Sequence, residues 1–323
     1  MIGNKILVTG GAGFIGTNLC QDLIMEGCEV TCFDNFSTGF FNNIKSLLNH
    51  KNFKLIEGDI RDLNECNKAC KNIDFVLHNA ALGSVPRSIS DPINSTENNI
   101  NGFLNMLIAS RDNKVKKLIY AASSSTYGDS EQIPKIENKI GNPLSTYAIT
   151  KYVNELYACV FKKNYNFNTI GLRYFNVFGP HQDPNGSYAA VIPKFIKIMI
   201  NKKAPVINGD GSISRDFTFV KNVINMNKYA ILHNSNKINN QIYNVACGEA
   251  HTLNDLFTLI KSYLIKKGFD IESLNPIYGN SRKGDIPHSL ASIKKSYKAF
   301  NYKPEVKFKK GLEKTIDWYL ESE

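Results

Sequence analysis

The chain has 323 residues, of which 42% are hydrophobic and 21% charged, and 39 Lys and Arg against 29 Asp and Glu give a formal net charge of +10. This composition predicts a globular protein of roughly two domains and excludes a disordered chain. The sequence has no apolar run of about 18 residues and no signal-peptide pattern at its start. We therefore expect a cytoplasmic protein without a membrane span.

The patterns of basic residues and cysteines argue against binding of nucleic acid and of metal. Lysines are scattered in short pairs without interleaved aromatic residues, which argues against nucleic-acid binding and suits a surface that attracts an anionic substrate. The seven cysteines include no CxxC pair and no Cys/His cluster with zinc spacing. We therefore predict free thiols in a reducing compartment and no metal.

Strand and helix patterns alternate through the first half of the chain. Helical patterns, as at 14–26 and 98–111, separate short apolar runs at 5–9, 29–33, 53–56, 74–78 and 117–121. This alternation predicts an α/β fold with a doubly wound parallel sheet, Rossmann-like. Beyond residue 176 the pattern loosens into turns, a helix at 190–201, a strand at 241–246 and further helices with a strand near 275–278. We expect these segments to form a smaller domain interleaved with the end of the first.

Three glycines follow the first predicted strand directly and open the first predicted helix. Gly10 permits a tight turn, Gly13 lets the backbone approach a pyrophosphate, and Gly16 lets the helix pack closely on the sheet. The amino end of the helix offers free N–H groups and its positive dipole end to the phosphates. Glycines alone are weak evidence, but the strand before them and the helix after them favour a dinucleotide site.

Acidic residues after the second and third predicted strands extend this site. Asp34 lies 18 residues past the last of the three glycines, where a carboxylate accepts hydrogen bonds from an adenosine ribose. It would repel a 2′-phosphate, and no arginine stands beside it to compensate, so NAD is favoured over NADP. Asp59 either caps a helix or hydrogen-bonds the adenine edge, and the sequence leaves both interpretations open.

Tyr147 and Lys151 are four residues apart and therefore share one face of a predicted helix. A nearby ammonium and a positively charged nicotinamide both favour the phenolate. We therefore expect the pKa of Tyr147 to fall from about 10 toward a working pH. A run of hydroxyl residues, Ser123 to Ser125, follows a predicted strand 24 residues earlier and is placed to hydrogen-bond the reacting oxygen.

Together these residues resemble the extended short-chain dehydrogenase/reductases and, within them, the nucleotide-sugar epimerases. The match covers about residues 3 to 320, and further family-like segments are 78–81, 98–102, 172–179, 214–217 and 282–285. Segments 81–88 and 183–190 resemble the UDP-N-acetylglucosamine 4-epimerases. That subgroup prefers N-acetylated sugars and serves bacterial surface polysaccharide synthesis, which includes lipopolysaccharide.

The resemblance implies NAD as cofactor and 4-epimerisation of a UDP-sugar as the reaction. Tyr147 would take the proton of the sugar's 4-hydroxyl while a hydride passes from carbon 4 to NAD. The 4-keto sugar would then turn over and receive the hydride on its opposite face. Lys151 would bind the nicotinamide ribose, and the position of Ser123 favours it as the assisting hydroxyl, with Ser124 and Ser125 left open. The expected cofactor contacts are Gly10, Gly13, Phe14, Ile15, Gly16, Asp34, Asn35, Ser37, Thr38, Gly39, Asp59, Ile60, Ala80, Ala81, Asn99, Tyr147, Lys151 and Tyr174.

The serine run also argues against two related reactions. The similar 4,6-dehydratases need an Asp-Glu pair after the hydroxyl residue to eliminate water, and decarboxylating relatives tend to use a Glu there. Ser124 and Ser125 occupy these positions. The acid/base pair is missing, so the epimerase remains the favoured interpretation.

Small residues in the expected sugar pocket favour an N-acetylated substrate. Gly83, Ala190 and Ser289 stand where strict glucose/galactose epimerases have bulky residues, and Ser289 falls at the position of a gatekeeper tyrosine. By the same resemblance, Arg215 and Arg282 would pair with the UDP diphosphate. The expected substrate contacts are Gly83, Ser84, Asn176, Gln182, Ala190, Val191, Asn208, Arg215, Arg282, Asp285 and Ser289.

These expectations define two domains and one preferred reaction. Residues 1–177 plus about 219–248 would bind NAD, and about 178–218 plus 249–323 would bind the nucleotide sugar. The preferred reaction interconverts UDP-GlcNAc and UDP-GalNAc. Two alternatives stay open: the same chemistry on a UDP-N-acetylhexosaminuronic acid or on UDP-glucose and UDP-galactose, and a non-catalytic NAD-sensing protein, although such proteins commonly lose the Tyr/Lys pair. By resemblance, the helix around Tyr147 would pair with helix 98–111 in a four-helix homodimer interface.

Overall fold

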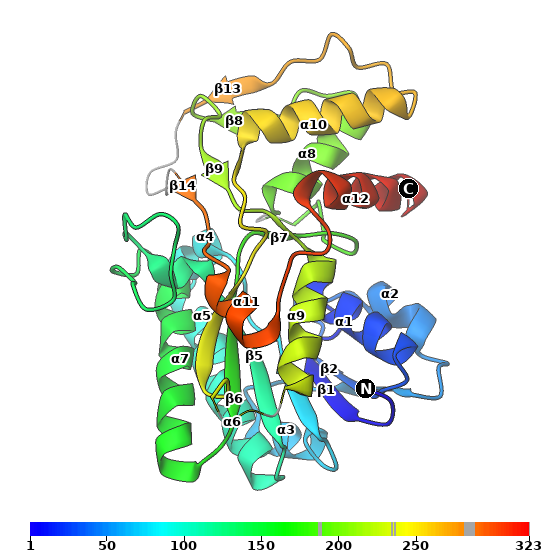
Figure 1. The fold of residues 1–323 in the computed structure, drawn as a ribbon. Helices are drawn as coiled ribbons and strands as arrows, with labels where there is room; N and C mark the ends of the chain where they lie inside the picture. The colour runs from blue at the N-terminus through cyan, green and yellow to red at the C-terminus, as the bar shows by residue number, and fades with distance from the viewer. Residues whose placement is uncertain (187–188, 234, 236, 281–287, 323) are drawn as a thin grey trace.

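The computed structural model describes residues 1–186, 189–233, 235, 237–280 and 288–322, with a large α/β part below a smaller, mostly helical part (Figure 1). The large part is built on one sheet of seven parallel strands, which confirms the predicted fold class. In spatial order these are β11 (Gln241–Val245), β6 (Thr169–Tyr174), β5 (Lys117–Ser123), β4 (Phe75–His78), β1 (Lys5–Thr9), β2 (Glu29–Asp34) and β3 (Phe53–Glu57).

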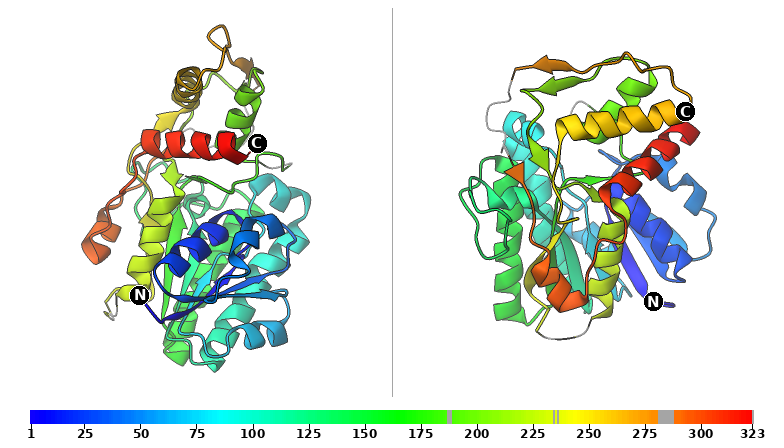
Figure 2. Two further views of the ribbon diagram at one scale, coloured as in Figure 1. Left: turned by 90° about the vertical axis from the view of Figure 1, so that its right-hand side faces the viewer. Right: turned by 45° about the horizontal axis from the view of Figure 1, so that its top comes forward.

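The central strands are buried because helices cover both faces of the sheet (Figures 1 and 2). Ile6 and Val8 of β1 pack into the core on one face, whereas Leu7 between them packs into the core on the other. Successive side chains of a strand point to opposite faces, so an unbroken apolar run is what a sheet covered on both sides requires.

Two sets of helices provide these covers. On the face of Ile6 and Val8 lie α1 (Phe14–Met25), α2 (Phe41–Ile44) with the short turn η1 (Lys45–Leu47), α9 (Val220–Leu232) and α11 (Lys294–Phe300). On the other face lie α3 (Leu63–Ala69), α6 (Gly102–Asp112) and α7 (Thr146–Tyr165). Short elements connect the strands at the upper edge: α4 (Val85–Ser90), α5 (Pro92–Thr96), the π-helical turn η2 (Glu97–Asn101) and the 3-10 turn η3 (Ser124–Tyr127).

The smaller part lies above the carboxyl edge of the sheet (Figure 1). Its helices are α8 (Val191–Ile200), α10 (Leu253–Lys266) and α12 (Phe308–Ser322). Its short strands form the pair β8 (Val206–Asn208) and β13 (Ile277–Gly279), the pair β7 (Val177–Phe178) and β10 (Thr218–Phe219), and the group β12 (His251–Thr252), β9 (Ser214–Arg215) and β14 (His288–Ser289). No helix in the described part of the chain is both long and apolar enough to cross a membrane.

Helix α11 differs from the expected division of the chain. The sequence assigned all of 249–323 to the nucleotide-sugar part, but α11 packs on strand β11 of the large sheet. The ring centres of Phe300 and Tyr243 are 4.8 Å apart, and Ser296 Oγ donates a hydrogen bond to the Asn244 carbonyl. The apolar side chain of Phe300 covers this end strand, so the segment returns to the sheet before α12 begins.

Candidate active site

Two adjoining cavities open at the carboxyl edge of the sheet, where the strand order reverses between β1 and β4. Doubly wound sheets bind their ligands at this position. The first cavity has a volume of about 490 Å³ and the second of about 1080 Å³. Both are lined by Gly83, Tyr147 and Asn176, so ligands in the two cavities would meet at Tyr147.

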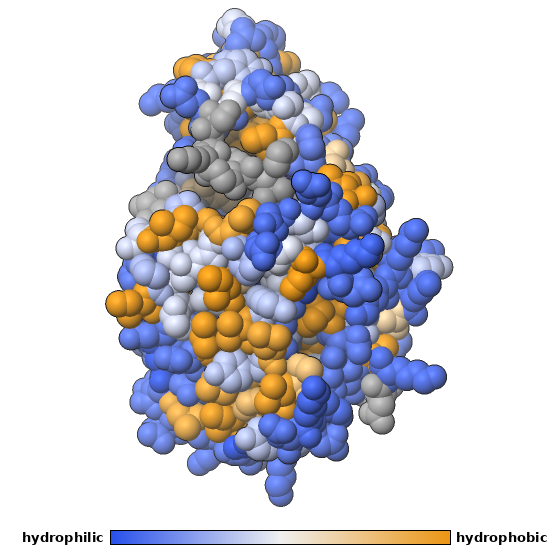
Figure 3. All heavy atoms as spheres, turned by 90° about the vertical axis from the view of Figure 1, so that its left-hand side faces the viewer, coloured by the Kyte–Doolittle hydropathy of each residue, from blue (hydrophilic) through white to orange (hydrophobic). Residues whose placement is uncertain are grey.

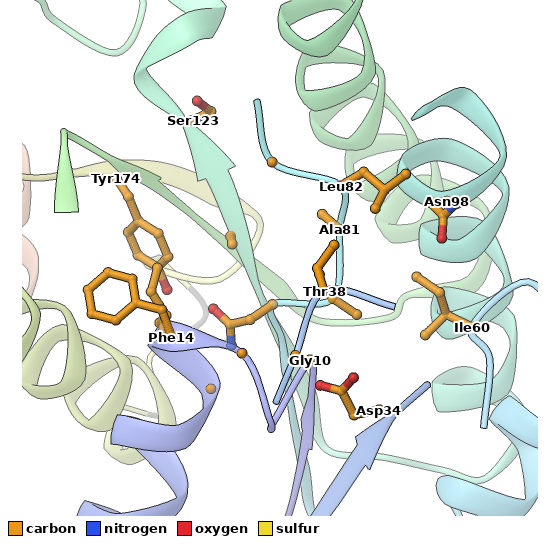
Figure 4. Close-up of a pocket in the computed structure, with 18 of the residues that line it drawn as sticks. Gly10, Phe14, Asp34, Thr38, Ile60, Ala81, Leu82, Asn98, Ser123 and Tyr174 are labelled. Atoms are coloured by element: carbon orange, nitrogen blue, oxygen red, sulfur yellow. The ribbon is translucent and has the colours of Figure 1, made fainter. Parts of the chain in front are cut away.

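The first cavity runs along the strand ends (Figure 4). Asp34 and Ile60 lie near one end, Gly10 lies near the middle, and Ser123 and Tyr174 lie toward the other end. A cavity of this elongated shape suits an extended ligand whose two ends contact different side chains.

The glycine loop after β1 leaves no room for side chains. Gly10 has φ +65°, and a Cβ there would lie 2.8 Å from the Ala80 nitrogen. A Cβ on Gly16 would lie 2.0 Å from the Gly10 carbonyl oxygen, and Gly13 begins α1 without a side-chain cap. The amino end of α1 therefore faces the cavity with free N–H groups, which is the arrangement that binds a pyrophosphate.

Asp34, the last residue of β2, lies at the adenosine end of this cavity. Its carboxylate accepts hydrogen bonds from the backbone N–H groups of Ala12, at 2.9 Å, and Phe36, at 2.8 Å. Burial raises the pKa of the Asp34 carboxyl, and the backbone hydrogen bonds oppose that rise. The described residues that line the cavity include no arginine, so this end favours a ribose with free hydroxyls over a 2′-phosphate.

The helix-capping interpretation of Asp59 is wrong, because Asp62 caps α3. The Asp59 carboxylate instead accepts hydrogen bonds from Arg61, at 2.7 Å, and from the Asn35 side chain, at 3.0 Å. The hydrogen bond from Arg61 is the main reason that the pKa of Asp59 falls to about 2. Asp59 is not among the lining residues, whereas Asn35 and Ile60 are, so Asp59 orients the cavity wall from behind.

Most of the expected cofactor contacts line the first cavity, and Asn99 does not. Asn99 accepts a hydrogen bond from the Leu82 nitrogen and donates to the Leu82 carbonyl and to Thr150 Oγ1, so it holds the loop after β4 from behind. The expected contacts that do line the cavity are Gly10, Gly13, Phe14, Ile15, Gly16, Asp34, Asn35, Ser37, Thr38, Gly39, Ile60, Ala80, Ala81, Tyr147, Lys151 and Tyr174.

Two amide side chains add an independent sign that a polar ligand belongs in this cavity. Asn79 Oδ1 and Gln182 Oε1 are buried, line the cavity and accept no hydrogen bond from the described residues. Buried polar atoms normally have partners, and NAD offers ribose hydroxyls and an amide as donors. Sequence reasoning missed Asn79, although its place just after β4 puts it at the carboxyl edge of the sheet. It assigned Gln182 to the substrate, but Gln182 lines the first cavity and not the second.

Tyr147 and Lys151 lie in the first two turns of α7. The Ser145 hydroxyl caps this helix by accepting a hydrogen bond from the Ala148 nitrogen. Lys151 Nζ donates to the Ala121 carbonyl at 2.8 Å and lies 5.9 Å from the centre of the Tyr147 ring. The helix and strand β5 thus bring the phenol and the ammonium to the boundary between the two cavities.

The geometry favours Ser123 among the three serines. Ser123 lies at the end of β5, lines the cavity beside Tyr147 and lowers the pKa of the Tyr147 phenol. Ser125 does not line the cavity, and its hydroxyl donates to Ser123 Oγ at 2.9 Å. Ser124 lines the cavity. The Ser125 hydrogen bond orients the Ser123 hydroxyl, whose own proton can then point toward Tyr147.

When only the protein's own groups act on Tyr147, the prediction that its pKa falls is wrong. Burial raises the pKa of Tyr147, and the nearby Ser123 hydroxyl only partly opposes that rise. Burial also lowers the pKa of Lys151 to about 8. The sequence argument considered the positive charge of Lys151 but not the loss of water around both groups, which disfavours the charged form of each.

The lining of the second cavity contains small residues and positively charged side chains. A Cβ on Gly83 would meet no atom within 4 Å. The described lining residues include Lys194 and Arg215 and no carboxylate, so the cavity suits an anion. Sequence reasoning missed Lys194, although it lies in the first turn of α8, three residues after the predicted contact Val191. The predicted residues that line this cavity are Gly83, Ser84, Asn176, Ala190, Val191, Asn208 and Arg215.

Besides Gln182, three predicted substrate contacts are not placed in this cavity. Ser289 lies in β14, opposite Arg215 of β9 in the strand register, and is absent from the described lining residues. Arg282 and Asp285 lie outside the described residues. Among the residues that the structure places, no group of three or more His, Cys, Asp or Glu side chains could hold a metal ion.

Comparison with known proteins gives matches that span both parts of the molecule. The model of the NAD dependent epimerase/dehydratase family matches residues 6–246. A putative UDP-glucose 4-epimerase of Methanocaldococcus jannaschii is 35% identical over 315 residues, which cover 97% of each chain.

Solved structures extend this likeness. A UDP-N-acetylglucosamine 4-epimerase from Methanobrevibacter ruminantium M1, in complex with UDP-N-acetylmuramic acid, gives a TM-score of 0.92 at 40% identity, covering 100% of both chains. A UDP-glucuronic acid 4-epimerase from Bacillus cereus, in complex with UDP-glucuronic acid and NAD, gives a TM-score of 0.89 at 31% identity, covering 99% of this chain and 100% of that one. The similarity therefore extends over both the sheet and the smaller helical part.

Proposed function

Since the chain belongs to the NAD-dependent epimerase/dehydratase family and is a UDP-sugar 4-epimerase with NAD as its cofactor, we propose that it interconverts UDP-GlcNAc and UDP-GalNAc through a transient 4-keto sugar. The observation that carries the substrate assignment is the second cavity, which is roomy and cationic and meets the first at Tyr147. An open position at Gly83 and a small side chain at Ala190 leave space for an N-acetyl group.

The roles of the reacting side chains follow from their positions. Bound NAD supplies a reversible hydride acceptor. Tyr147 takes the proton of the sugar's 4-hydroxyl and returns it after the sugar has turned over. Ser123, oriented by Ser125, hydrogen-bonds the 4-oxygen beside Tyr147. Lys151, fixed by the Ala121 carbonyl, holds the nicotinamide ribose at the junction of the cavities.

The diphosphate and the remaining sugar oxygens belong to the second cavity in this proposal. Arg215 provides a guanidinium for the diphosphate, and Lys194 adds a second positive charge beside the first turn of α8.

The test incubates the purified protein with UDP-GlcNAc, without added reductant, and follows the anomeric signals by proton NMR. We expect UDP-GalNAc to appear with the wild type and with Tyr165→Phe, an exposed tyrosine on the same helix, but not with Tyr147→Phe. Parallel reactions contain UDP-glucose and UDP-glucuronic acid. Turnover of these alone would keep the mechanism and overturn the substrate assignment, and turnover by Tyr147→Phe would overturn the role of Tyr147.

An apolar face on α4, α5 and α7 supports the proposed homodimer (Figure 3). Ile89 and Ile93 are 65% and 73% exposed, and Ile149, Leu156 and Val160 of α7 are each exposed by 45% or more. A second copy of this chain would cover such a face. Light scattering at micromolar concentration measures this directly, and a monodisperse monomer would contradict the dimer.

All seven cysteines are free and six are buried, in keeping with the proposal that the enzyme works in the cytoplasm.

A further inference from the structure

A buried ion pair lies one helical turn beyond Lys151. Arg173 of β6 and Glu155 of α7 are 2% and 8% exposed. Arg173 Nε donates to Glu155 Oε1 at 2.8 Å, and Arg173 Nη2 donates to Glu155 Oε2 at 2.7 Å. This two-point contact fixes both the distance and the orientation of the two side chains.

Arg173 also contacts the turn that follows Ser123. Its guanidinium carbon lies 4.7 Å from the ring centre of Tyr127, at the end of η3. The Tyr127 hydroxyl donates to Asn244 Oδ1 at 2.6 Å, which ties that ring to the end strand β11. A third bond runs from Arg173 Nη1 to the Glu137 carbonyl at 3.1 Å. One guanidinium thus contacts both the catalytic helix and the serine turn.

The strand register places this contact beside the reacting groups. Arg173 is paired with Ala122 and the next pair along is Tyr174 with Ser123. Glu155 is eight residues beyond Tyr147 on α7, which is roughly 12 Å along the helix axis. A shift of α7 along its axis would therefore move Tyr147 relative to Ser123, and Arg173 touches both elements that define this distance.

We propose that Arg173 and Glu155 are positioning residues that fix α7 against β5 and η3, so that the Tyr147 hydroxyl keeps its position relative to Ser123. This inference rests on the proposed function of Tyr147. Stability alone does not account for the pair, because burying two charges costs most of what their attraction returns, and apolar replacements of similar volume are often neutral or stabilising. A displacement of about 1 Å at a reacting atom, in contrast, can cost about 100-fold in rate.

The test uses the double variant Arg173→Met with Glu155→Leu in the full-length enzyme, which removes both charges together. We expect the free energy of unfolding and the content of bound NAD to be retained. We expect kcat to fall about 10- to 100-fold while KM changes by less than about threefold. The rising limb of kcat against pH should move to higher pH, because a Ser123 hydroxyl held beside Tyr147 lowers the pKa of Tyr147.

A control removes another ion pair, neither of whose residues lines a cavity. Lys267, directly after α10, and Asp317 of α12 are 2.7 Å apart, and Lys267→Met with Asp317→Leu should leave kcat and the pH profile unchanged. A stable Arg173→Met, Glu155→Leu variant with wild-type kcat and pH profile would overturn the inference. If this variant does not fold, Arg173→Lys decides the matter: it keeps the charge but loses the two-point contact, and an unchanged kcat would overturn the proposal.

The proposed function and this inference fail separately. Tyr147→Phe is assayed alongside, and full activity in that variant would overturn the proposed function itself. An inactive Tyr147→Phe together with a fully active Arg173→Met, Glu155→Leu variant would overturn only the positioning role.

Discussion

Replacing Lys151 with methionine should stabilise the fold while it abolishes turnover. Lys151 is 4% exposed, and burial lowers its pKa from 10.5 to about 8. At pH 7 this difference corresponds to about 3 kcal/mol by which protonated Lys151 destabilises the folded chain. The hydrogen bond to the Ala121 carbonyl returns about 1 kcal/mol. We therefore expect Lys151→Met to raise the free energy of unfolding by about 2 kcal/mol at pH 7.

The pH dependence gives this prediction its signature. Between pH 8 and 10.5 the unfolded chain keeps the lysine proton while the folded chain has released it. The stability contributed by this group therefore rises with pH across that window. The advantage of Lys151→Met should accordingly shrink, approaching zero at about pH 9.5.

The assay is urea unfolding of nucleotide-free protein, followed by circular dichroism at pH 7 and at about pH 9.5. Lys163→Met, an exposed lysine on the same helix, serves as the control and should change stability by no more than about 0.5 kcal/mol. The reasoning would be refuted by a Lys151→Met variant less stable than the wild type at pH 7. A stability difference that does not vary with pH would refute it equally.

Two further predictions concern the NAD site and use bound NAD, measured after denaturation, as the readout. Gly16→Ala should lose NAD, because its Cβ would lie 2.0 Å from a backbone oxygen. Gly279→Ala should retain NAD, because the nearest atom to its Cβ would be a Val206 side-chain carbon at 3.3 Å. Asp34→Asn should weaken NAD binding at least about tenfold, because an amide accepts fewer hydrogen bonds than the carboxylate that now receives two backbone N–H groups. Unchanged NAD content in Gly16→Ala, or unchanged affinity by calorimetry in Asp34→Asn, would contradict these interpretations.

Much of the cofactor site could be predicted because its requirements are local in sequence. Gly10 needs a positive φ, Gly16 needs the absence of a Cβ, and both lie within one strand–turn–helix unit. Tyr147 and Lys151 are joined by helical periodicity, and Asp34 by its place at the end of a strand. In each case a short segment contains the whole physical reason for the residue.

Predictions that required distant segments to meet were less secure. Ser289 stands in a strand register with β9 and is absent from the described lining of the sugar cavity, and Gln182 lines the other cavity. Asn99 supports a loop from behind the cofactor wall. Lys194 lines the second cavity, although the sequence analysis did not predict it. Closeness to a known motif in the sequence indicates that a residue lies near the site, but it does not indicate which cavity its side chain lines.

The sequence by itself determined the fold class, the dinucleotide loop and the Tyr147–Lys151 pair, because periodicity and backbone conformation are properties of short segments. Only the tertiary structure decided the direction of the Tyr147 pKa, since burial is the sum of neighbours contributed by many elements. Only the tertiary structure shows that Arg173 contacts Glu155, because the two residues are on different elements and 18 residues apart. Hydrogen bonds between elements and the exclusion of water depend on packing in three dimensions, and no local pattern of residues contains that information.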